Sequence, residues 1–487
     1  MRRYVAFFLI AAMTAGLLFM LFSRIRAPYT APAEEIADGG GDAGDAGDAT
    51  VIDASSIDAS AIDAAKAERP VRVTMLGWEL ASPLAMMGDA STIEAAPETQ
   101  LDSVRDRLSR GGIDPAGADV AIMPLPSFVA VYDRLRALEP KAFLVVGFSR
   151  GREEFHATVG AIAKPLNGVY AVKLLALSPS TGLDATARAA GTESATLLGL
   201  FTLDLLGAPP ARVQFVEPGT DSGKAASFSV FAKGIADDRR LALSTSDASR
   251  LVPIVAVASR ATLDEPRIQA FARTWLDALG QARIDAAGVA RRLAAKDGVR
   301  LGQGVGSAPD AVPLLEQLGT VEPVSLADEG MWIGSTNPVT LETLMQRTWS
   351  LSRGGGITSD SAPDPLPIDT RIATAIAPSA ALRPHVDSAD ADAGAPFKPL
   401  PTGTTLLAIY RAPIEATSEQ VATQVAFLSG VFERASFRVS AKGGEKVARL
   451  IAASARDKND VSSARLAMVP SEPPPGFAAV VEILALP

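Results

Sequence analysis

The fold of this chain is decided by three segments: A-D-V-A-I-M-P-L-P-S-F (residues 118–128), A-F-L-V-V-G-F-S-R-G (residues 142–151) and S-T-S-D-A-S-R-L-V-P-I-V-A-V-A-S-R (residues 244–260). Each segment contains an apolar run of strand length that is bounded by Pro, Gly or Ser, the residues that interrupt strands. Strand-like and helix-like runs alternate between the segments. This alternation predicts an α/β domain.

Further runs complete the expected elements. The first strand of the folded part is expected at residues 71–77, and two more are expected at residues 212–216 and 240–243. Residues 224–232 (K-A-A-S-F-S-V-F-A) lie between the last two strands, and we expect them to form a helix. Helical apolar spacing with an aromatic stripe follows at residues 264–295.

The same segments carry a family resemblance. The D-V-A strand at residues 119–121 is similar to the strand that leads into the ligand cleft of a transport family, and residues 243–248 and 251–257 are similar to that family's return crossing between two lobes. The chain thus resembles the extracytoplasmic solute-binding proteins of ABC transporters, of the nitrate, sulfonate and thiamine-precursor type. The resemblance points to a fold more firmly than to a ligand.

The resemblance implies an α/β, bilobal type II periplasmic-binding fold over residues 70–360. Lobe one is expected to comprise residues 70–155 and 251–360, and lobe two residues 156–250. In the family the two lobes close by hinge motion around a small ligand. A small-molecule ligand and an ABC permease are therefore the expected partners.

Cysteine and histidine usage narrows the chemistry. The chain has no cysteine in 487 residues, which excludes disulfides, a thiol nucleophile and a lipid-modified bacterial N-terminus. The two histidines are His156, expected to be a partly buried strand residue, and His385, expected in a linker. No G-x-S-x-G, phosphate-loop or H-E-x-x-H motif occurs. We therefore expect a binding protein rather than an enzyme, with no cofactor and no metal.

The net charge of −9 is concentrated in one tract. Residues 33–69 contain ten acidic and two basic side chains, and they repeat Gly, Asp and Ala. Such a composition does not support a packed core, so a disordered acidic linker is expected. The rest of the chain is close to neutral and has no basic stripe, which gives no indication of nucleic-acid binding.

The N-terminus carries a membrane signal. Arg2 and Arg3 precede residues 4–22, which are apolar apart from Thr14 and Gly16. As a helix, this run would span roughly the ~30 Å hydrocarbon core. A cleaved signal peptide and an uncleaved anchor are both open, but the single small-x-small candidate, residues 31–33, lies late and contains a proline. We favour an anchor in residues 1–32, with the folded domains in the periplasm and a single pass through the bacterial inner membrane.

The C-terminal part has a different pattern. Residues 361–401 are expected to be a linker with a short helix at 370–377, and residues 402–487 show strands and helices in the order βαβαββ, with Ser418 as a helix N-cap. This order, and the final A-V-V-E-I-L-A-L, resemble the OmpA-like envelope domain. The residues that bind peptidoglycan in that family are replaced here, for example by Lys442-Gly443-Gly444. We expect a degenerate domain and doubt that it binds peptidoglycan.

Polar residues at strand ends are the candidate ligand contacts, because ligands of α/β sheets bind beyond the carboxyl ends of strands and near helix N-termini. Several have a plainer alternative: Trp78 is a core residue, Arg150 and Arg152 are solvated charges, and Ser127, Thr192 and Ser194 are helix caps. The candidates are Trp78, Glu79, Ser127, Ser149, Arg150, Arg152, Thr192, Ser194 and Asp247.

Two functions remain open. The first is a membrane-anchored periplasmic solute-binding protein that captures a small ligand for an ABC transporter. The second is a non-transport envelope sensor or scaffold, which keeps the bilobal fold but binds a protein partner. An enzyme on the same fold is a third and weaker possibility, because fold alone assigns no reaction.

Overall fold

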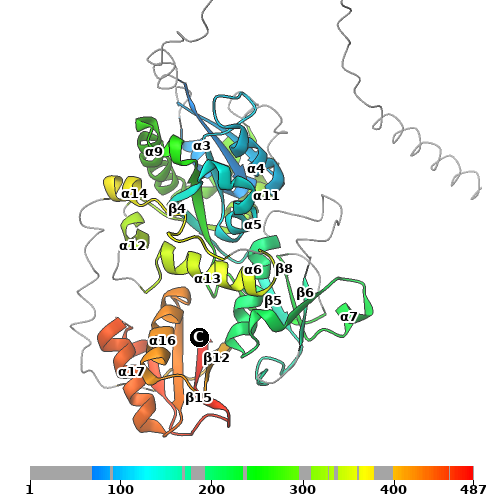
Figure 1. Ribbon diagram of the computed structural model, residues 1–487, viewed down its shortest axis with the longest axis vertical. Helices are drawn as coiled ribbons and strands as arrows, with labels where there is room; N and C mark the ends of the chain where they lie inside the picture. Colours follow the sequence, from blue (N-terminus) through cyan, green and yellow to red (C-terminus); the bar gives the residue numbers. More distant parts are fainter. Residues whose placement is uncertain are drawn as a thin grey trace, which may run out of the picture. The chain divides into compact units, whose positions relative to one another are not determined.

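The computed structural model describes residues 69–485, except 88–91, 167–170, 177–191, 234–237, 296–308, 327, 334–337, 359–360, 378–396, 398 and 460 (Figure 1). The expected anchor at residues 4–22 lies outside the described residues, as do residues 33–68 of the expected acidic linker. Among the helices that are described, none is long and apolar enough to cross a membrane.

A six-stranded sheet organises what we call lobe one. Its order is β11-β4-β10-β3-β1-β2, in which β1 pairs in parallel with β2 and β3, while β10 runs antiparallel to β3 and β4. The strands are β1 (Val71–Leu76), β2 (Ile93–Glu98), β3 (Val120–Pro124), β4 (Lys141–Ser149), β10 (Pro253–Ala258) and β11 (Val321–Pro323).

Helices pack on both faces of this sheet, so its central strands β3 and β10 are apolar at every position. In β3, Val120 and Ile122 belong to the core cluster that contains Trp275 of α9, while Ala121 and Met123 belong to the cluster on the other face. The helical elements of this part are η2 (Trp78–Leu80), α3 (Ser82–Met86), α4 (Leu101–Arg110), α5 (Leu125–Leu135), η3 (Arg136–Leu138), α8 (Arg260–Leu263), α9 (Pro266–Ala282), α10 (Ala286–Ala294), α11 (Ala311–Leu318), α12 (Glu329–Ile333), α13 (Leu341–Gly354) and α14 (Arg371–Ile376).

A five-stranded sheet, with order β7-β6-β8-β5-β9, organises lobe two. Its strands are β5 (Glu153–Ala157), β6 (Val172–Ala176), β7 (Val213–Val216), β8 (Phe228–Ala232) and β9 (Arg240–Ser244), and its helical elements are α6 (Thr192–Leu205), η4 (Pro210–Arg212) and α7 (Asp221–Lys224). His156 lies in β5 and is 8% exposed, as expected for a partly buried strand residue.

The two sheets share one topology. Without β11, the strand order in lobe one is β2-β1-β3-β10-β4, and the strand order in lobe two is β7-β6-β8-β5-β9. The fourth strand in each order, β10 or β5, is antiparallel to the third and lies next to a crossing between the lobes. The chain crosses between β4 and β5 and returns between β9 and β10. This arrangement confirms the two-lobed α/β fold that the resemblance predicts.

Two local predictions in the lobes need correction. Residues 228–232 form strand β8 rather than the end of a helix, because they pair with β5 and β6 in the middle of their sheet and are buried on both faces. A short apolar run does not distinguish a buried strand from a buried helix. Strand β2 has no counterpart in the sequence prediction, since its I-E-A-A-P-E composition is untypical. Its edge position tolerates Pro97.

A third sheet, with order β12-β15-β13-β14, forms the C-terminal unit, which we define as residues 405–485. Its elements are β12 (Thr405–Pro413), α16 (Ser418–Val431), β13 (Ala435–Ala441), α17 (Glu445–Asn459), η5 (Ser463–Arg465), β14 (Leu466–Met468) and β15 (Phe477–Ala485). The predicted order βαβαββ is confirmed. The N-cap of α16 is Thr417 and not Ser418, because Thr417 and Gln420 form a capping box.

Candidate ligand-binding cleft

A cleft of about 1290 Å³ is lined by residues of both lobes. On the side of lobe one, its lining follows directly after the ends of three strands: Gly77 and Trp78 follow β1, Thr99 follows β2, and Arg150 follows β4. On the side of lobe two, Lys233 follows β8. The cleft therefore lies where α/β sheets bind ligands, beyond the carboxyl ends of their strands.

Four of the nine predicted site residues line this cleft, namely Trp78, Glu79, Arg150 and Arg152. Ser149 is 2% exposed and donates to the buried carboxylate of Glu153. Asp247 accepts hydrogen bonds from the backbone N–H and the hydroxyl of Ser244, which is itself a lining residue. Asp247 thus acts on the turn beside the cleft rather than on the cleft itself.

The remaining three predicted residues lie apart from this lining. Ser127, in the first turn of α5, is fully buried and donates to a carboxylate oxygen of Glu193 over 3.3 Å. Thr192 and Ser194 lie in the first turn of α6, and Ser194 is fully buried. These hydroxyl residues lie where α5 packs against α6.

A buried charge network lies on one side of the cleft. Arg152 forms an ion pair with Glu79, and its Nε lies 3.9 Å from the carboxylate of Glu153. Glu153 is fully buried and accepts hydrogen bonds from Ser149 and, over 2.9 Å, from Thr245. Burial raises the pKa of Glu153, and the nearby charge of Arg152 opposes that shift. Because Glu79 and Arg152 neutralise each other, neither offers an unpaired charge to a ligand.

The turn that holds Glu79 requires a glycine. Gly77 has φ of 103°, in the region that L-residues rarely adopt. A Cβ atom at this position would lie 2.2 Å from the Glu79 carboxylate. Gly77 therefore allows β1 to end abruptly and leaves room for the Glu79 carboxylate that pairs with Arg152.

Two cations remain available, one from each lobe. The side chains of Arg150 and Lys233 are exposed, line the cleft, and form no ion pair with any residue that the structure describes. Their backbones are fixed, because the Arg150 N–H donates to Thr320 over 2.7 Å and the Lys233 N–H donates to Arg152 over 2.6 Å. Two further carboxylates line the cleft besides Glu79, those of Glu154 and of Glu316 on α11. A carboxylate oxygen of Glu154 lies 3.6 Å from Nε2 of His156.

The cleft also has apolar walls. Leu241 of lobe two is 55% exposed and Leu315 of α11 is 38% exposed, although both are large aliphatic side chains. Pro313 and the partly buried Trp78 add apolar surface on the side of lobe one. Large exposed aliphatic groups that face one cleft from two lobes are typical of a ligand-binding surface. Within the described ranges, no cluster of three or more His, Asp or Glu residues has the arrangement of a metal site.

Sequence reasoning missed Lys233, Leu241 and Leu315. The signal for Lys233 was present: it follows F-S-V-F-A, and reading that run as a strand would have placed Lys233 at a strand end. Leu241 lies within a correctly predicted strand, but its exposure depends on the packing of lobe two. Leu315 lies on α11, about 165 residues beyond Arg150 along the chain, and only tertiary packing brings it to the cleft.

No protein-family model matches the sequence, and no curated protein matches it. Solved structures do. The ligand-binding component of an ABC-type import system from Staphylococcus aureus, with zinc bound, has a TM-score of 0.39 and 12% identity, and the match covers 63% of this chain and 98% of that one. The periplasmic aliphatic sulphonate binding protein of Escherichia coli has a TM-score of 0.37 and 14% identity, covering 62% and 91%.

The periplasmic nitrate-binding protein of Synechocystis is also similar, with a TM-score of 0.35 and 13% identity, over 63% of this chain and 84% of that one. Similarity of this degree assigns neither a ligand nor a partner to the chain. The shared strand order of the two sheets, which is independent of these values, establishes the two-lobed fold.

Proposed function

We propose that this chain is a periplasmic solute-binding protein that captures an organic anion with an apolar portion and delivers it to an ABC transporter. The observation that carries the proposal is the pair of exposed, unpaired cations, Arg150 and Lys233, which face one cleft from opposite lobes. The exposed side chains of Leu241 and Leu315 beside them supply apolar contact. Binding rather than catalysis is the proposed activity.

The anionic group of the ligand would accept hydrogen bonds from both cations and so bridge the lobes. Such charge-assisted hydrogen bonds contribute about 1.5–3 kcal/mol when one partner is charged. The aliphatic part would cover Leu241 and Leu315, which gains about 25 cal/mol for each Å² of apolar surface removed from water. Glu154 and Glu316 in the lining disfavour a polyanion.

The proposal extends to the parts of the chain around the cleft. Residues 1–32 would anchor the protein in the inner membrane, and residues 33–69 would tether the lobes in the periplasm within reach of a permease. The C-terminal unit would be a degenerate OmpA-like domain. Its turn at Lys442-Gly443-Gly444 offers no carboxylate of its own, and this supports a role other than peptidoglycan binding.

Ligand titrations of the full chain test the proposal. Octanesulfonate is expected to raise the melting temperature. Inorganic sulfate, which lacks the apolar portion, and octanol, which lacks the anionic group, are expected to have little effect. A ligand present at 100 times its dissociation constant stabilises by about 2.7 kcal/mol. Arg150→Ala is expected to weaken octanesulfonate binding at least about tenfold, which corresponds to loss of one charge-assisted hydrogen bond.

The matched control is Arg110→Ala, because Arg110 is exposed at the end of α4 and forms no ion pair within the described structure. Binding should be unchanged in this variant. Equal stabilisation by sulfate and octanesulfonate would show that the ligand needs no apolar portion and would contradict that part of the proposal. No stabilisation by either, combined with capture of an envelope protein, would favour the alternative function as a sensor or scaffold.

One observation favours that alternative enough to keep it as a second candidate. The C-terminal unit contacts a segment that crosses between the lobes, through a hydrogen bond from Arg250 N–H to the Val431 carbonyl over 3.2 Å. A receptor whose hinge bears a further domain is suited to report ligand occupancy. Crosslinking of the full chain in membranes, with and without octanesulfonate, separates a transporter complex from a complex with another envelope protein.

A further inference from the structure

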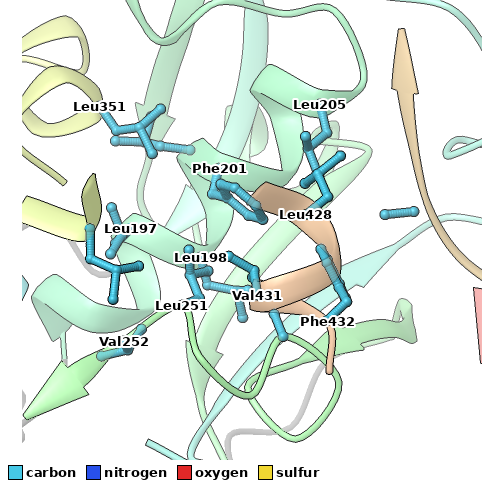
Figure 2. Packing of buried hydrophobic residues seen from close by; sticks show 14 of the residues in the cluster. Leu197, Leu198, Phe201, Leu205, Leu251, Val252, Leu351, Leu428, Val431 and Phe432 are labelled. Atoms are coloured by element: carbon cyan, nitrogen blue, oxygen red, sulfur yellow. The ribbon is translucent and has the colours of Figure 1, made fainter. Parts of the chain in front are cut away.

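The segment that returns from lobe two to lobe one is covered by the C-terminal unit. Leu251 and Val252, in the crossing between β9 and β10, are 2% and 0% exposed. They belong to the same buried cluster as Leu428, Val431 and Phe432 at the end of α16 (Figure 2). A crossing segment that must change conformation when lobes move is therefore packed inside an apolar core.

Arg250 fixes this crossing by charge. Its Nη2 lies 2.8 Å from a carboxylate oxygen of Glu322 in β11 of lobe one and 2.9 Å from one of Glu433 in the C-terminal unit. Its guanidinium also lies over the rings of Phe148, at 4.8 Å, and Trp332, at 5.6 Å. One side chain, only 11% exposed, thus joins the crossing, lobe one and the C-terminal unit.

Lobe two is bound to the C-terminal unit by a separate set of contacts. Arg411 of β12 is 6% exposed and donates to the carbonyls of Ala163 over 2.9 Å, Leu206 over 3.3 Å and Ile162 over 3.4 Å. The ring of Phe432 stacks on that of Phe201 in α6, with centroids 6.2 Å apart (Figure 2). These carbonyls lie in lobe two at the end of α6 and in the loop after β5.

Helix α13 forms a second bridge between the lobes. Trp349 packs edge-on against Tyr132 of α5 in lobe one, with ring centroids 5.1 Å apart. Arg347 forms an ion pair with Asp204 of α6 in lobe two. The segment just before α13 also meets the C-terminal unit, because a Cβ atom at Gly430 would lie 2.3 Å from the side chain of Val339, which precedes the N-cap of α13.

We propose that the C-terminal unit is a hinge clamp: it binds lobe two and the returning crossing at the same time, so that the angle between the lobes and the docking of the unit are coupled. Rotation of the lobes moves the crossing that carries Arg250 relative to the lobe-two carbonyls that Arg411 binds, and the C-terminal unit contacts both. By thermodynamic linkage, a ligand that favours one lobe angle also changes the docking of the unit, and weakened docking widens the range of lobe angles. This coupling can be measured without a known ligand of the cleft.

The absence of cysteine makes a direct measurement possible. Ile113 of lobe one is 67% exposed and Val159 of lobe two is 75% exposed, so Ile113→Cys and Val159→Cys place one spin label on each lobe of the full chain. Pulsed electron paramagnetic resonance then gives the distribution of distances between the lobes. In the otherwise unaltered protein we expect one narrow distribution.

The clamp is loosened by Glu322→Gln combined with Glu433→Gln, which leaves Arg250 without a carboxylate and keeps the apolar cluster intact. We expect a broader or two-peaked distance distribution, and about tenfold faster amide exchange in residues 245–252, as expected when charge-assisted hydrogen bonds are lost. The matched control is Glu482→Gln, because Glu482 forms an ion pair with Arg438 within the C-terminal unit itself. The control should leave both readouts unchanged.

If the double variant melts at a much lower temperature, Glu433→Gln alone is measured instead. The Glu433 side chain is 47% exposed, so this substitution removes the charge without disturbing the core. A distance distribution and an exchange rate that stay unchanged in folded variants would overturn the clamp. Broadening in Glu482→Gln as well would also overturn it, since the effect would not be specific to the hinge. The test uses no ligand, so its result is independent of the anion-binding proposal.

Discussion

At the scale of single residues, the buried carboxylate of Glu329 makes the stability of the fold depend on pH. Glu329 is fully buried, and its Oε1 accepts a hydrogen bond from the Val145 N–H over 2.9 Å. Its Oε2 has no hydrogen-bond partner among the described residues. Burial raises the pKa of Glu329 from 4.5 to about 8. No sequence pattern indicates this, because an acidic residue next to a second one, Asp328, is usually solvated.

The raised pKa predicts a pH dependence with a definite sign. Below pH 4.5 the Glu329 side chain is protonated in both the folded and the unfolded state, so its ionisation does not change the free energy of unfolding. Between pH 4.5 and about 8 the unfolded state ionises first, and the free energy of unfolding falls as the pH rises. Glu329→Gln should flatten this slope in denaturant titrations, whereas the exposed Asp277→Asn should not. Parallel slopes for wild type and Glu329→Gln would contradict the assignment.

At the scale of elements, capping explains where α16 begins. Thr417 accepts a hydrogen bond from the Gln420 N–H over 3.2 Å, and the Gln420 side chain accepts one from the Thr417 N–H over 2.9 Å. Ser418 is already the first helical residue. Sequence reasoning placed a hydroxyl cap within one residue of the true position, because Thr and Ser are both good N-caps and adjacent candidates differ only in backbone conformation.

Adjacent alanine substitutions test this assignment. Thr417→Ala is expected to lower the free energy of unfolding of the C-terminal unit by about 1 kcal/mol, since it removes the cap. Ser418→Ala is expected to change it by less than about 0.5 kcal/mol, because it alters a helical surface position. Chemical denaturation followed by far-ultraviolet circular dichroism measures both. The reverse ranking would restore Ser418 as the cap.

At the scale of the whole molecule, three sheets share one extended apolar core. A single buried cluster contains Phe128 of lobe one, Phe201 of lobe two and Phe432 of the C-terminal unit. The C-terminal unit therefore packs on lobe two and shares its core. Burial lowers the pKa of Arg411, yet its contacts with three carbonyls keep the charge satisfied within this core.

Arg411→Ala tests whether this docking stabilises the protein. The substitution removes the Arg411 donor from the carbonyls of Ile162 and Ala163, while the Leu206 carbonyl keeps the Leu166 N–H as a donor. We expect a loss of at least about 2 kcal/mol in the free energy of unfolding. Arg438→Ala, which removes an exposed ion pair in the same unit, should cost no more than about 1 kcal/mol. Similar small losses in both variants would mean that docking contributes little.

By itself the sequence determined the α/β class, most strands and the βαβαββ order of the C-terminal unit, whereas the two-lobed arrangement was implied by the family resemblance and not by local patterns. The class, the strands and the order follow from local apolar periodicity and from turn residues, which act over a few residues. Sequence reasoning also selected Trp78, Glu79, Arg150 and Arg152, because strand ends are recognisable locally. It assigned β8 wrongly, because a run buried on both faces has no period that separates strand from helix.

Only the tertiary structure decided which charges are free. Arg150 and Arg152 look equivalent in the sequence S-R-G-R, but Glu79 neutralises Arg152, whereas Arg150 forms no ion pair with any described residue. It likewise decided that Arg250, whose contacts no sequence pattern indicates, joins three parts of the molecule. Pairing and burial depend on residues that are distant along the chain, and the electrostatic energy of a charge depends on its partners and its exposure to solvent. Local patterns carry no information on either.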